Sequence, residues 1–282
     1  MFKKVYIEIT NVCNLRCAFC PGTRRPPRTM SPDEFASALD KLGARARYVY
    51  LHVMGEPLLH PRLDELLALA AARDVRVCIT TNGVLLEARA DTLLQAPALH
   101  KVSVSLHSVE ENGGDPGEAR AYLEAAWDFA ARAAARGVIV ALRLWNEGAA
   151  DAHNGVILDF LREKTGAADW PEPRAHSFRL AENLYLEREA AFAWPDLRAD
   201  ETRTEFCQAL RTQLAVLADG TVVPCCLDHE GDLALGNLFA QPLDDILNGA
   251  RARAIYDGFS RRRPTEALCR RCGYATRFNR GG

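Results

Sequence analysis

Nine cysteines are present in this chain of 282 residues, and three of them lie close together near the amino terminus. Cys13, Cys17 and Cys20 have the spacing C-x3-C-x2-C. Thiolates at such short spacing converge on one centre, and soft sulfur ligands select zinc, copper or an iron–sulfur cluster. A closed zinc site needs a fourth ligand, and no further Cys or His lies nearby. Three thiolates on a four-iron cluster would leave one iron open to an exchangeable ligand, which predicts a site for chemistry.

The composition is that of a soluble globular protein, with 48% hydrophobic and 26% charged residues. A net charge of −2 gives no support for a nucleic-acid or membrane partner. We expect no membrane span and no signal peptide, because no apolar run is long enough and the chain enters a strand at once. Cysteines without an export signal favour metal binding over disulfides, and they predict a reducing, cytoplasmic location.

Alternating strand and helix patterns must position the three thiols. Strands are expected at residues 5–10, 48–53, 75–81, 101–106 and 138–145, with a sixth within 177–186. Helices are expected at residues 32–42, 61–73, 85–95, 117–136 and 156–164, the first beginning with a capping box of Ser31 and Glu34. This alternation predicts a parallel sheet with right-handed crossovers. Six units are too few for the eight-stranded barrel, so we expect an α/β fold, an open six-stranded parallel partial (β/α)6 barrel.

The two faces of the expected strands differ in polarity. Val5, Ile7 and Ile9 alternate with polar residues, and positions 102–107 repeat the pattern. Parallel strands covered on both faces are usually apolar throughout. We infer that the apolar face meets the helices and that the other face lines a polar lumen, although a simply packed core is the alternative. In parallel barrels the chemistry lies at the carboxyl ends of the strands, where the cysteine loop also lies.

The cysteine motif, with Phe19 directly before its third thiol, resembles that of the radical S-adenosylmethionine (SAM) enzymes. In that family the three thiolates hold a 4Fe–4S cluster, and its open iron chelates the amino and carboxylate groups of SAM. One electron then cleaves SAM to methionine and a 5′-deoxyadenosyl radical, which abstracts hydrogen from a substrate. The resemblance therefore implies a radical SAM enzyme.

Gly55-Glu56-Pro57 follows the second strand and resembles the G-G-E-P-type turn of this family, with Met54 in place of the first glycine. The resemblance implies that this turn and its carboxylate hold the methionine amino group. A plain surface turn is the alternative.

Further cofactor contacts are expected where the third and fourth strands end. Thr80 and Asn82 share the lumen face and are candidates to touch SAM or substrate, although a plain turn would also place them there. Ser105 occupies the region where the family often uses a serine for the SAM ribose or carboxylate. Arg120 is the best positional match to an arginine that pairs with the SAM carboxylate in related enzymes.

Three side chains are candidates for catalysis. Arg143 ends the fifth strand, where a buried guanidinium needs an anionic partner, and SAM or substrate would serve. His52 and His107 lie at strand ends and could accept a proton near neutral pH, as could Arg143. A structural histidine is the alternative for each imidazole. The basic loop 24–28 is expected to be solvated, with an anionic substrate contact as its alternative.

The later cysteines resemble those of the SPASM and shorter twitch domains that follow many radical SAM barrels. The resemblance lies in D-G-x-V-x-P-C-C at 219–226, L-G-N at 235–237 and the closing C-x2-C. It implies one fully ligated 4Fe–4S cluster on Cys207, Cys225, Cys269 and Cys272, with spacing similar to the butirosin-type aminocyclitol dehydrogenases. Cys226 is left without a role, and a zinc knuckle is the alternative for the four ligands.

We therefore expect a barrel at residues 1–190, a linker at 191–206 and a hairpin-plus-helix cluster domain at 207–282. The expected function is a two-electron oxidation in which the auxiliary cluster accepts an electron from the substrate radical. The expected partners are a small-molecule or peptide substrate and a flavodoxin- or ferredoxin-type electron donor.

Two alternatives remain open. One is radical modification of a ribosomally made peptide, by thioether formation or epimerisation. The other is a zinc-knuckle nucleic-acid-binding protein, which would use the basic, aromatic-containing tail beyond residue 260. The near-neutral net charge argues against the second alternative.

Overall fold

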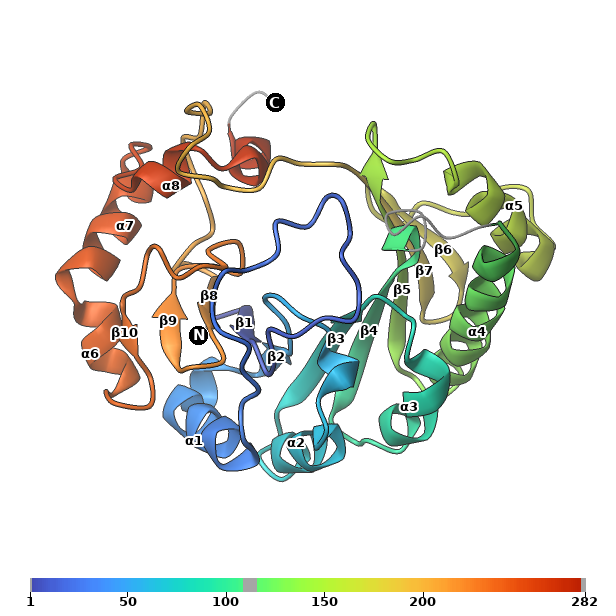
Figure 1. Cartoon of the computed structure of the whole chain (residues 1–282), viewed down its shortest axis with the longest axis horizontal. Coiled ribbons are helices and arrows are strands. Elements are labelled where there is room, and N and C mark those ends of the chain that lie inside the picture. Colours follow the sequence, from blue (N-terminus) through green and yellow to red (C-terminus); the bar gives the residue numbers. More distant parts are fainter. Residues whose placement is uncertain (1, 109–115, 280–282) are drawn as a thin grey trace.

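The computed structural model describes residues 2–108 and 116–279. Its strands form one sheet in the order β10-β9-β8-β1-β2-β3-β4-β5-β7-β6. Figure 1 shows this sheet curving through an open ring, with the helices on the outside. The strand bounds are β1 Lys4–Ile7, β2 Tyr48–Tyr50, β3 Arg76–Thr81, β4 Leu99–Ser105, β5 Ile139–Glu147, β6 Ser177–Ala181, β7 Leu184–Ala190, β8 Gln213–Val216, β9 Thr221–Val223 and β10 Gly236–Asn237.

The six strands β1, β2, β3, β4, β5 and β7 are parallel to one another and confirm the partial barrel, which does not close. The sixth parallel strand lies later than expected. The expected region begins with β6, which pairs antiparallel with β7 at the edge of the sheet. Asn183 makes the turn between them at φ 58°, a conformation that Asn tolerates better than most residues.

The helices cover the outer face of this sheet and match the expected order. Ser31 caps α1 in the predicted capping box, because its side chain accepts from the Glu34 amide while Glu34 reaches back to the Ser31 amide. The helix bounds are α1 Pro32–Leu42, α2 Leu63–Ala71, α3 Leu86–Leu94, α4 Pro116–Ala134, α5 Asn154–Thr165, α6 Leu243–Asn248, α7 Ala250–Ser260 and α8 Ala267–Arg270. No described helix has the length and apolar character that crossing a membrane requires.

The two faces of the strands separate as predicted. Val5, Ile7 and Val104 are fully buried and belong to the main core, which also contains apolar residues of the outer helices. Tyr6 and Tyr50 belong to a separate, smaller cluster on the inner face. The inner face also carries charged groups, as described below, and is therefore a polar lumen.

The carboxy-terminal part extends the barrel sheet instead of forming a sheet of its own. The predicted hairpin is present as β8 and β9, with Gly220 at φ 86° in its turn. Strand β8 pairs in parallel with β1, so the two cysteine groups belong to one continuous sheet. Residues 191–206 contain neither helix nor strand. The domain boundaries expected above stay a prediction.

Candidate active site

The loop of the first three thiols lies between β1 and α1 and reaches over the middle of the ring (Figure 1). Its two ends are held together by Asn11, whose Nδ2 donates to the Pro26 carbonyl at 2.9 Å and whose Oδ1 accepts from the Arg28 amide at 2.7 Å. Cys13 is exposed, and Cys17 and Cys20 are half-buried. The three thiols are therefore presented on a closed loop at the carboxyl edge of the parallel strands.

The turn at Gly55 packs directly against the start of this loop. Gly55 has φ 77°, and a Cβ there would lie 2.4 Å from the Thr10 carbonyl oxygen, so only glycine fits. The Glu56 amide donates to the Val12 carbonyl at 2.9 Å. Pro57 is buried behind the turn, as the first residue of a short 3-10 helix. This contact sets the height of the thiol loop above β2.

The buried Glu56 carboxylate joins the ends of two strands. It accepts from the Leu58 amide at 2.9 Å and from the Asn82 amide at 2.7 Å. Burial raises the pKa of Glu56, although these donors oppose the shift. The structure thus shows Glu56 fixing the turn after β3 relative to the turn after β2. Its role toward the amino group of SAM stays a prediction.

Asn82 connects the end of β3 to the thiol loop. Its Nδ2 donates to Asn14 Oδ1 at 2.8 Å and lies 3.9 Å from Cys13 Sγ. Tyr122 on α4 donates its hydroxyl hydrogen to the carbonyl of Asn82 at 2.8 Å and approaches that of Ser105 at 3.2 Å. Sequence reasoning missed Asn14 and Tyr122. The Asn14 position within the motif gave no signal, and the helix pattern gave no reason to assign Tyr122 a role.

Phe19 and His107 meet across the site. Their rings are 5.2 Å apart in an edge-on arrangement, and Phe19 is 39% exposed. His107 is buried beyond the end of β4, with its Nδ1 3.2 Å from the Arg143 carbonyl oxygen. The structure therefore brings the predicted residues at the ends of β1, β2, β3 and β4 around one loop.

Arg143 already has an anionic partner within the chain. Its Nε lies 3.0 Å from Glu187 Oε2 on β7, and its Nη1 donates to Thr80 Oγ1 at 3.4 Å. Lys101 on β4 binds the other Glu187 oxygen at 2.8 Å. Burial opposes ionisation of Glu187, but Arg143 and Lys101 outweigh it and lower the pKa of this carboxyl. Glu187 thus supplies the anionic partner that Arg143 needs, which does not favour Arg143 as a proton acceptor, and its catalytic role stays a prediction.

His52 lies in the lumen between the same charges. Burial, with Arg143 and Lys4 adding to it, lowers the pKa of His52 to about 3. The imidazole ring contacts those of Tyr6 and Tyr50 at 5.4 and 6.1 Å. His52 is therefore neutral at physiological pH and is a weak base.

The structure does not bring Arg120 to the site. Its guanidinium lies between α4 and α5, where it pairs with Glu163 at 2.8 Å and with Glu124 at 3.0 Å, over the Phe160 ring. These helices form the outer layer of the fold (Figure 1). Helical periodicity turns this position away from the lumen, which the match by sequence position did not consider.

A buried ion pair joins the thiol loop to the carboxy-terminal part. Arg25 makes two bonds of 2.7 Å to Glu8, whose side chain is fully buried, and its Nε donates to the His229 carbonyl. The same carboxylate accepts from the amides of Met54 and Ala218. The basic loop is therefore not simply solvated at Arg25. We call Glu8 and Arg25 the loop clamp.

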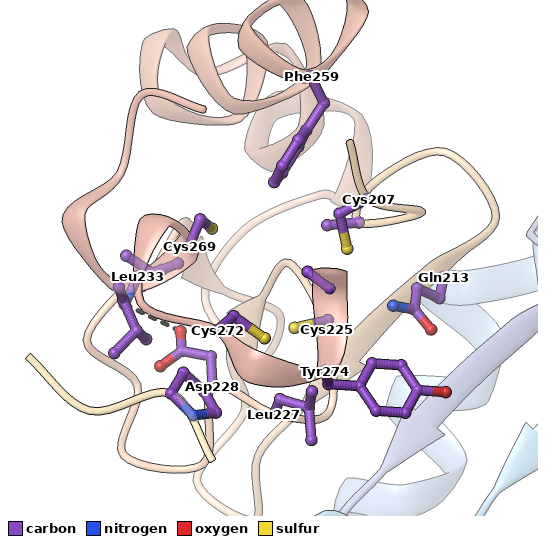
Figure 2. A pocket seen from close by; sticks show the side chains of 14 residues that line it. Cys207, Gln213, Cys225, Leu227, Asp228, Leu233, Phe259, Cys269, Cys272 and Tyr274 are labelled. Atoms are coloured by element: carbon purple, nitrogen blue, oxygen red, sulfur yellow. Dashed lines mark hydrogen bonds between the residues drawn. The ribbon is translucent and has the colours of Figure 1, made fainter. Parts of the chain in front are cut away.

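The second group of cysteines lines one pocket, which is partly open to solvent. Figure 2 shows Cys207, Cys225, Cys269 and Cys272 around the same space, with apolar side chains such as Leu227 and Phe259. Burial raises the pKa of all four thiols, in Cys207 to about 11, and neighbouring thiols add to the effect in Cys207, Cys225 and Cys269. A cluster bound here would remove the cost of ionising these thiols, because its cationic core would take the place of the thiol protons.

The donor sets fit iron–sulfur clusters. Among the described residues, no three His, Cys, Asp or Glu side chains form a group suited to a single metal ion. The four later thiols instead surround a larger space, and the three earlier ones share one accessible loop. Cys226 is not among the residues that line the pocket. It packs against the small inner-face cluster that contains Tyr6.

Comparisons with known proteins agree with this geometry. The model of the radical SAM superfamily matches residues 7–146, and that of the SPASM iron–sulfur cluster-binding domain matches residues 207–273. Both cysteine groups fall in these regions, so the zinc-knuckle alternative is not supported.

Curated relatives match only the amino-terminal part. A GTP 3′,8-cyclase of Chlorobaculum tepidum is 38% identical over 110 residues, which are 38% of this chain and 33% of that protein. An Fe-coproporphyrin III synthase of Methanosarcina barkeri is 31% identical over 107 residues, which are 37% of this chain and 27% of that protein. The chain thus matches about a third of the length of these relatives or less.

Solved structures of similar fold cover nearly the whole chain. BtrN in complex with AdoMet and 2-DOIA has a TM-score of 0.58 at 17% identity, covering 96% of this chain and 93% of its own. SuiB of Streptococcus suis bound to the precursor peptide SuiA has a TM-score of 0.56 at 16% identity, covering 97% and 70%. At these identities the likeness shows the fold alone. From its two matched regions, the chain belongs to the radical SAM superfamily, as an enzyme with SAM and two 4Fe–4S clusters as cofactors.

Proposed function

We propose that this protein carries out a two-electron oxidation of a substrate bound in the lumen. In this proposal Cys13, Cys17 and Cys20 hold the SAM-binding cluster, and the four pocket cysteines hold the auxiliary one. The observation that carries the proposal is the pocket itself, because four thiols around one space, two of them buried and two half-buried, can ligate a cluster completely. A fully ligated cluster has no free iron for substrate, which suits it to accept an electron.

When bound, SAM and its cluster supply a 5′-deoxyadenosyl radical, which takes a hydrogen atom from the substrate. The residues around the loop have the task of fixing SAM. Gly55 and Glu56 support one side, Asn82 and Ser105 another, and Phe19 with His107 closes the edge near the third thiol. The contacts of the Gly55–Glu56 turn, of Asn82 and of the Phe19–His107 pair join the thiol loop to strand ends, so together they would hold the reactive carbon above the lumen.

Oxidation of an alcohol carbon by this route releases one hydrogen atom, one proton and one electron. Arg143 is paired and charged, and the low pKa of His52 makes it a poor acceptor. We therefore assign the proton to His107, the candidate nearest to the thiol loop. The electron passes to the auxiliary cluster, which balances the step.

The electron donor is proposed to be of flavodoxin or ferredoxin type. Arginines of the basic carboxy-terminal segment are its candidate docking groups, but several are paired within the chain. Arg270 and Arg271 bind Glu201, and Arg262 binds Glu205. Docking by that segment would therefore have to compete with these internal ion pairs.

The test uses the anaerobically reconstituted enzyme with SAM, dithionite and a panel of deuterated polyols and peptides. We expect deuterium transfer into 5′-deoxyadenosine and a product oxidised by two electrons, one per deoxyadenosine formed. Cys269→Ala should keep deoxyadenosine formation and lose the oxidised product. A thioether or an epimer as the product, with Cys269→Ala still active, would replace the oxidation by the peptide-modification alternative.

A further inference from the structure

Three cationic side chains gather on the lumen face of the sheet. Lys4, Lys101 and Arg143 come from β1, β4 and β5, and we call them the lumen cations. Tyr6, Tyr50, Cys78 and Lys101 follow one another in register across β1 to β4, which places Lys101 on the same face as the two tyrosines. The Lys4 ammonium lies 5.8 Å from the centre of the Tyr50 ring. The three charges thus lie on the same face of the sheet.

Only one carboxylate is paired with this group among the described residues. Glu187 binds Lys101 at 2.8 Å and Arg143 at 3.0 Å, and their side chains are 15–20% exposed. Lys4 has no salt bridge in the described structure. Lys4 is an exposed residue, but its ammonium group is partly buried, and this burial lowers the pKa of Lys4. The charges of Arg143 and Lys101 lower the pKa further, whereas Cys226 opposes the shift. Three cations against one carboxylate leave two positive charges in excess.

Two buried nitrogen atoms beside these charges lack hydrogen-bond partners. They are Nδ1 of His52 and Nε1 of Trp145, whose ring lies 4.5 Å from the Arg143 guanidinium carbon. A buried polar atom without a partner destabilises the fold, so such atoms usually have a ligand or water to bind. An indole nitrogen only donates, so its partner must offer an acceptor oxygen.

SAM does not neutralise this excess. Its carboxylate balances its amino group, and the sulfonium adds one positive charge. A substrate with an amine would be repelled from the lumen, whereas one with an anionic group would gain from both uncompensated cations.

We propose that the lumen cations, with His52 and Trp145, form a subsite for a carboxylate or phosphoryl group of the substrate. This inference rests on the proposed function, because it takes the lumen as the substrate site. It adds that the substrate is a small anion, and that the charge of the lumen selects it.

The experiment measures binding and needs no turnover. Trp145 reports on the subsite, because its ring lies against Arg143. The reconstituted enzyme, saturated with SAM, is titrated with acetate, orthophosphate and methylammonium at constant ionic strength while tryptophan fluorescence is followed. Trp145→Phe identifies the signal. Acetate and orthophosphate distinguish a carboxylate from a phosphoryl group, and bound SAM ensures that its own carboxylate is not the anion detected.

A matched pair of variants tests the charge. Lys4→Met removes a lumen cation without depriving Glu187 of its partners, and Lys3→Met removes the neighbouring exposed charge on the other side of the strand. We expect one of the two anions to saturate the subsite at millimolar concentration. Lys4→Met should weaken the binding of that anion about tenfold, as the loss of one unit charge several Å away would. Lys3→Met should change affinity less than twofold, as screening of a remote charge implies.

Two results would overturn the subsite: no saturable signal from either anion, or equal effects of the two lysine variants. Tighter binding of methylammonium would also reject it. None of these three binding results would affect SAM cleavage or the oxidation. The subsite can therefore be rejected while the proposed function stands.

Discussion

The two cysteine groups lie on one sheet but are held in different ways. The amino-terminal three are presented on a loop, with Cys13 exposed, and hydrogen bonds from strand-end turns fix that loop. The carboxy-terminal four surround an apolar pocket, and Cys207 and Cys272 are buried. The first arrangement would leave a cluster accessible to a cosubstrate, whereas four thiols in the second would leave a cluster with no free iron for another ligand. In the proposed function, exposure thus separates the cluster that cleaves SAM from the one that accepts an electron.

The loop clamp connects the two groups. Glu8 is buried and accepts from the thiol loop through Arg25, from the Met54 turn and from the Ala218 turn of the hairpin. One carboxylate therefore sets the thiol loop relative to the carboxy-terminal part.

The largest effect should come from removing one thiol in each group. Cys17→Ala should abolish deoxyadenosine formation and keep about four irons, with little change in Tm, because its loop is accessible. Cys225→Ala should also keep about four irons but lower Tm by about 5 °C or more, because an unfilled pocket is left inside. Iron analysis and thermal unfolding give both values. Equal Tm losses would remove the distinction between the two regions.

The next effect is breaking the loop clamp. Glu8→Gln leaves the Arg25 charge with no carboxylate partner and should destabilise the fold by about 3–5 kcal/mol. The double variant Glu8→Gln with Arg25→Gln should recover part of this loss, because no uncompensated charge remains. Denaturant unfolding measures both. The control is Arg24→Gln, since that side chain is 84% exposed and its removal should change little. An equally large loss of unfolding free energy in Arg24→Gln would show that the positive charge of the loop, and not the loop clamp, stabilises the fold.

A smaller effect is expected at Gly55. Gly55→Ala places a Cβ against Thr10 in a strained conformation, which should cost about 1–3 kcal/mol. Gly55→Ala should raise the KM for SAM, because the added Cβ displaces the backbone under the thiol loop. The auxiliary cluster should be retained. Gly148→Ala is the control, because it also has positive φ but nothing within 4 Å. Similar KM values in both variants would show that backbone strain alone is responsible.

The smallest effect is expected at Arg120. Arg120→Gln should leave the KM for SAM unchanged, because its guanidinium binds Glu163 on the outer layer. A tenfold rise in KM would return this residue to the SAM site.

Short-range patterns carried most of what the sequence predicted. The capping box, the strand polarity and the hairpin at Gly220 depend on neighbouring residues and are confirmed. Ion-pair partners that come from distant strands could not be predicted in the same way. Glu187 is 44 residues from Arg143, so nothing local marked it as the anion that Arg143 needs. Arg25 looked like a surface residue because nothing near it in the sequence marks its partner Glu8, a buried residue that follows β1. The β6–β7 turn was missed because residues 177–186 were treated as one region containing a single strand. Asn183, at φ 58° in that turn, is the signal that could have marked it.

The most direct test of the two-cluster assignment is iron, sulfide and zinc content after anaerobic reconstitution, with SAM and dithionite added to detect 5′-deoxyadenosine. We expect about eight irons with matching sulfide per chain. When Cys13, Cys17 and Cys20 are all replaced by alanine, the iron content should fall to about four and no deoxyadenosine should form. Zinc in place of iron, or deoxyadenosine formation that survives the triple substitution, would contradict it.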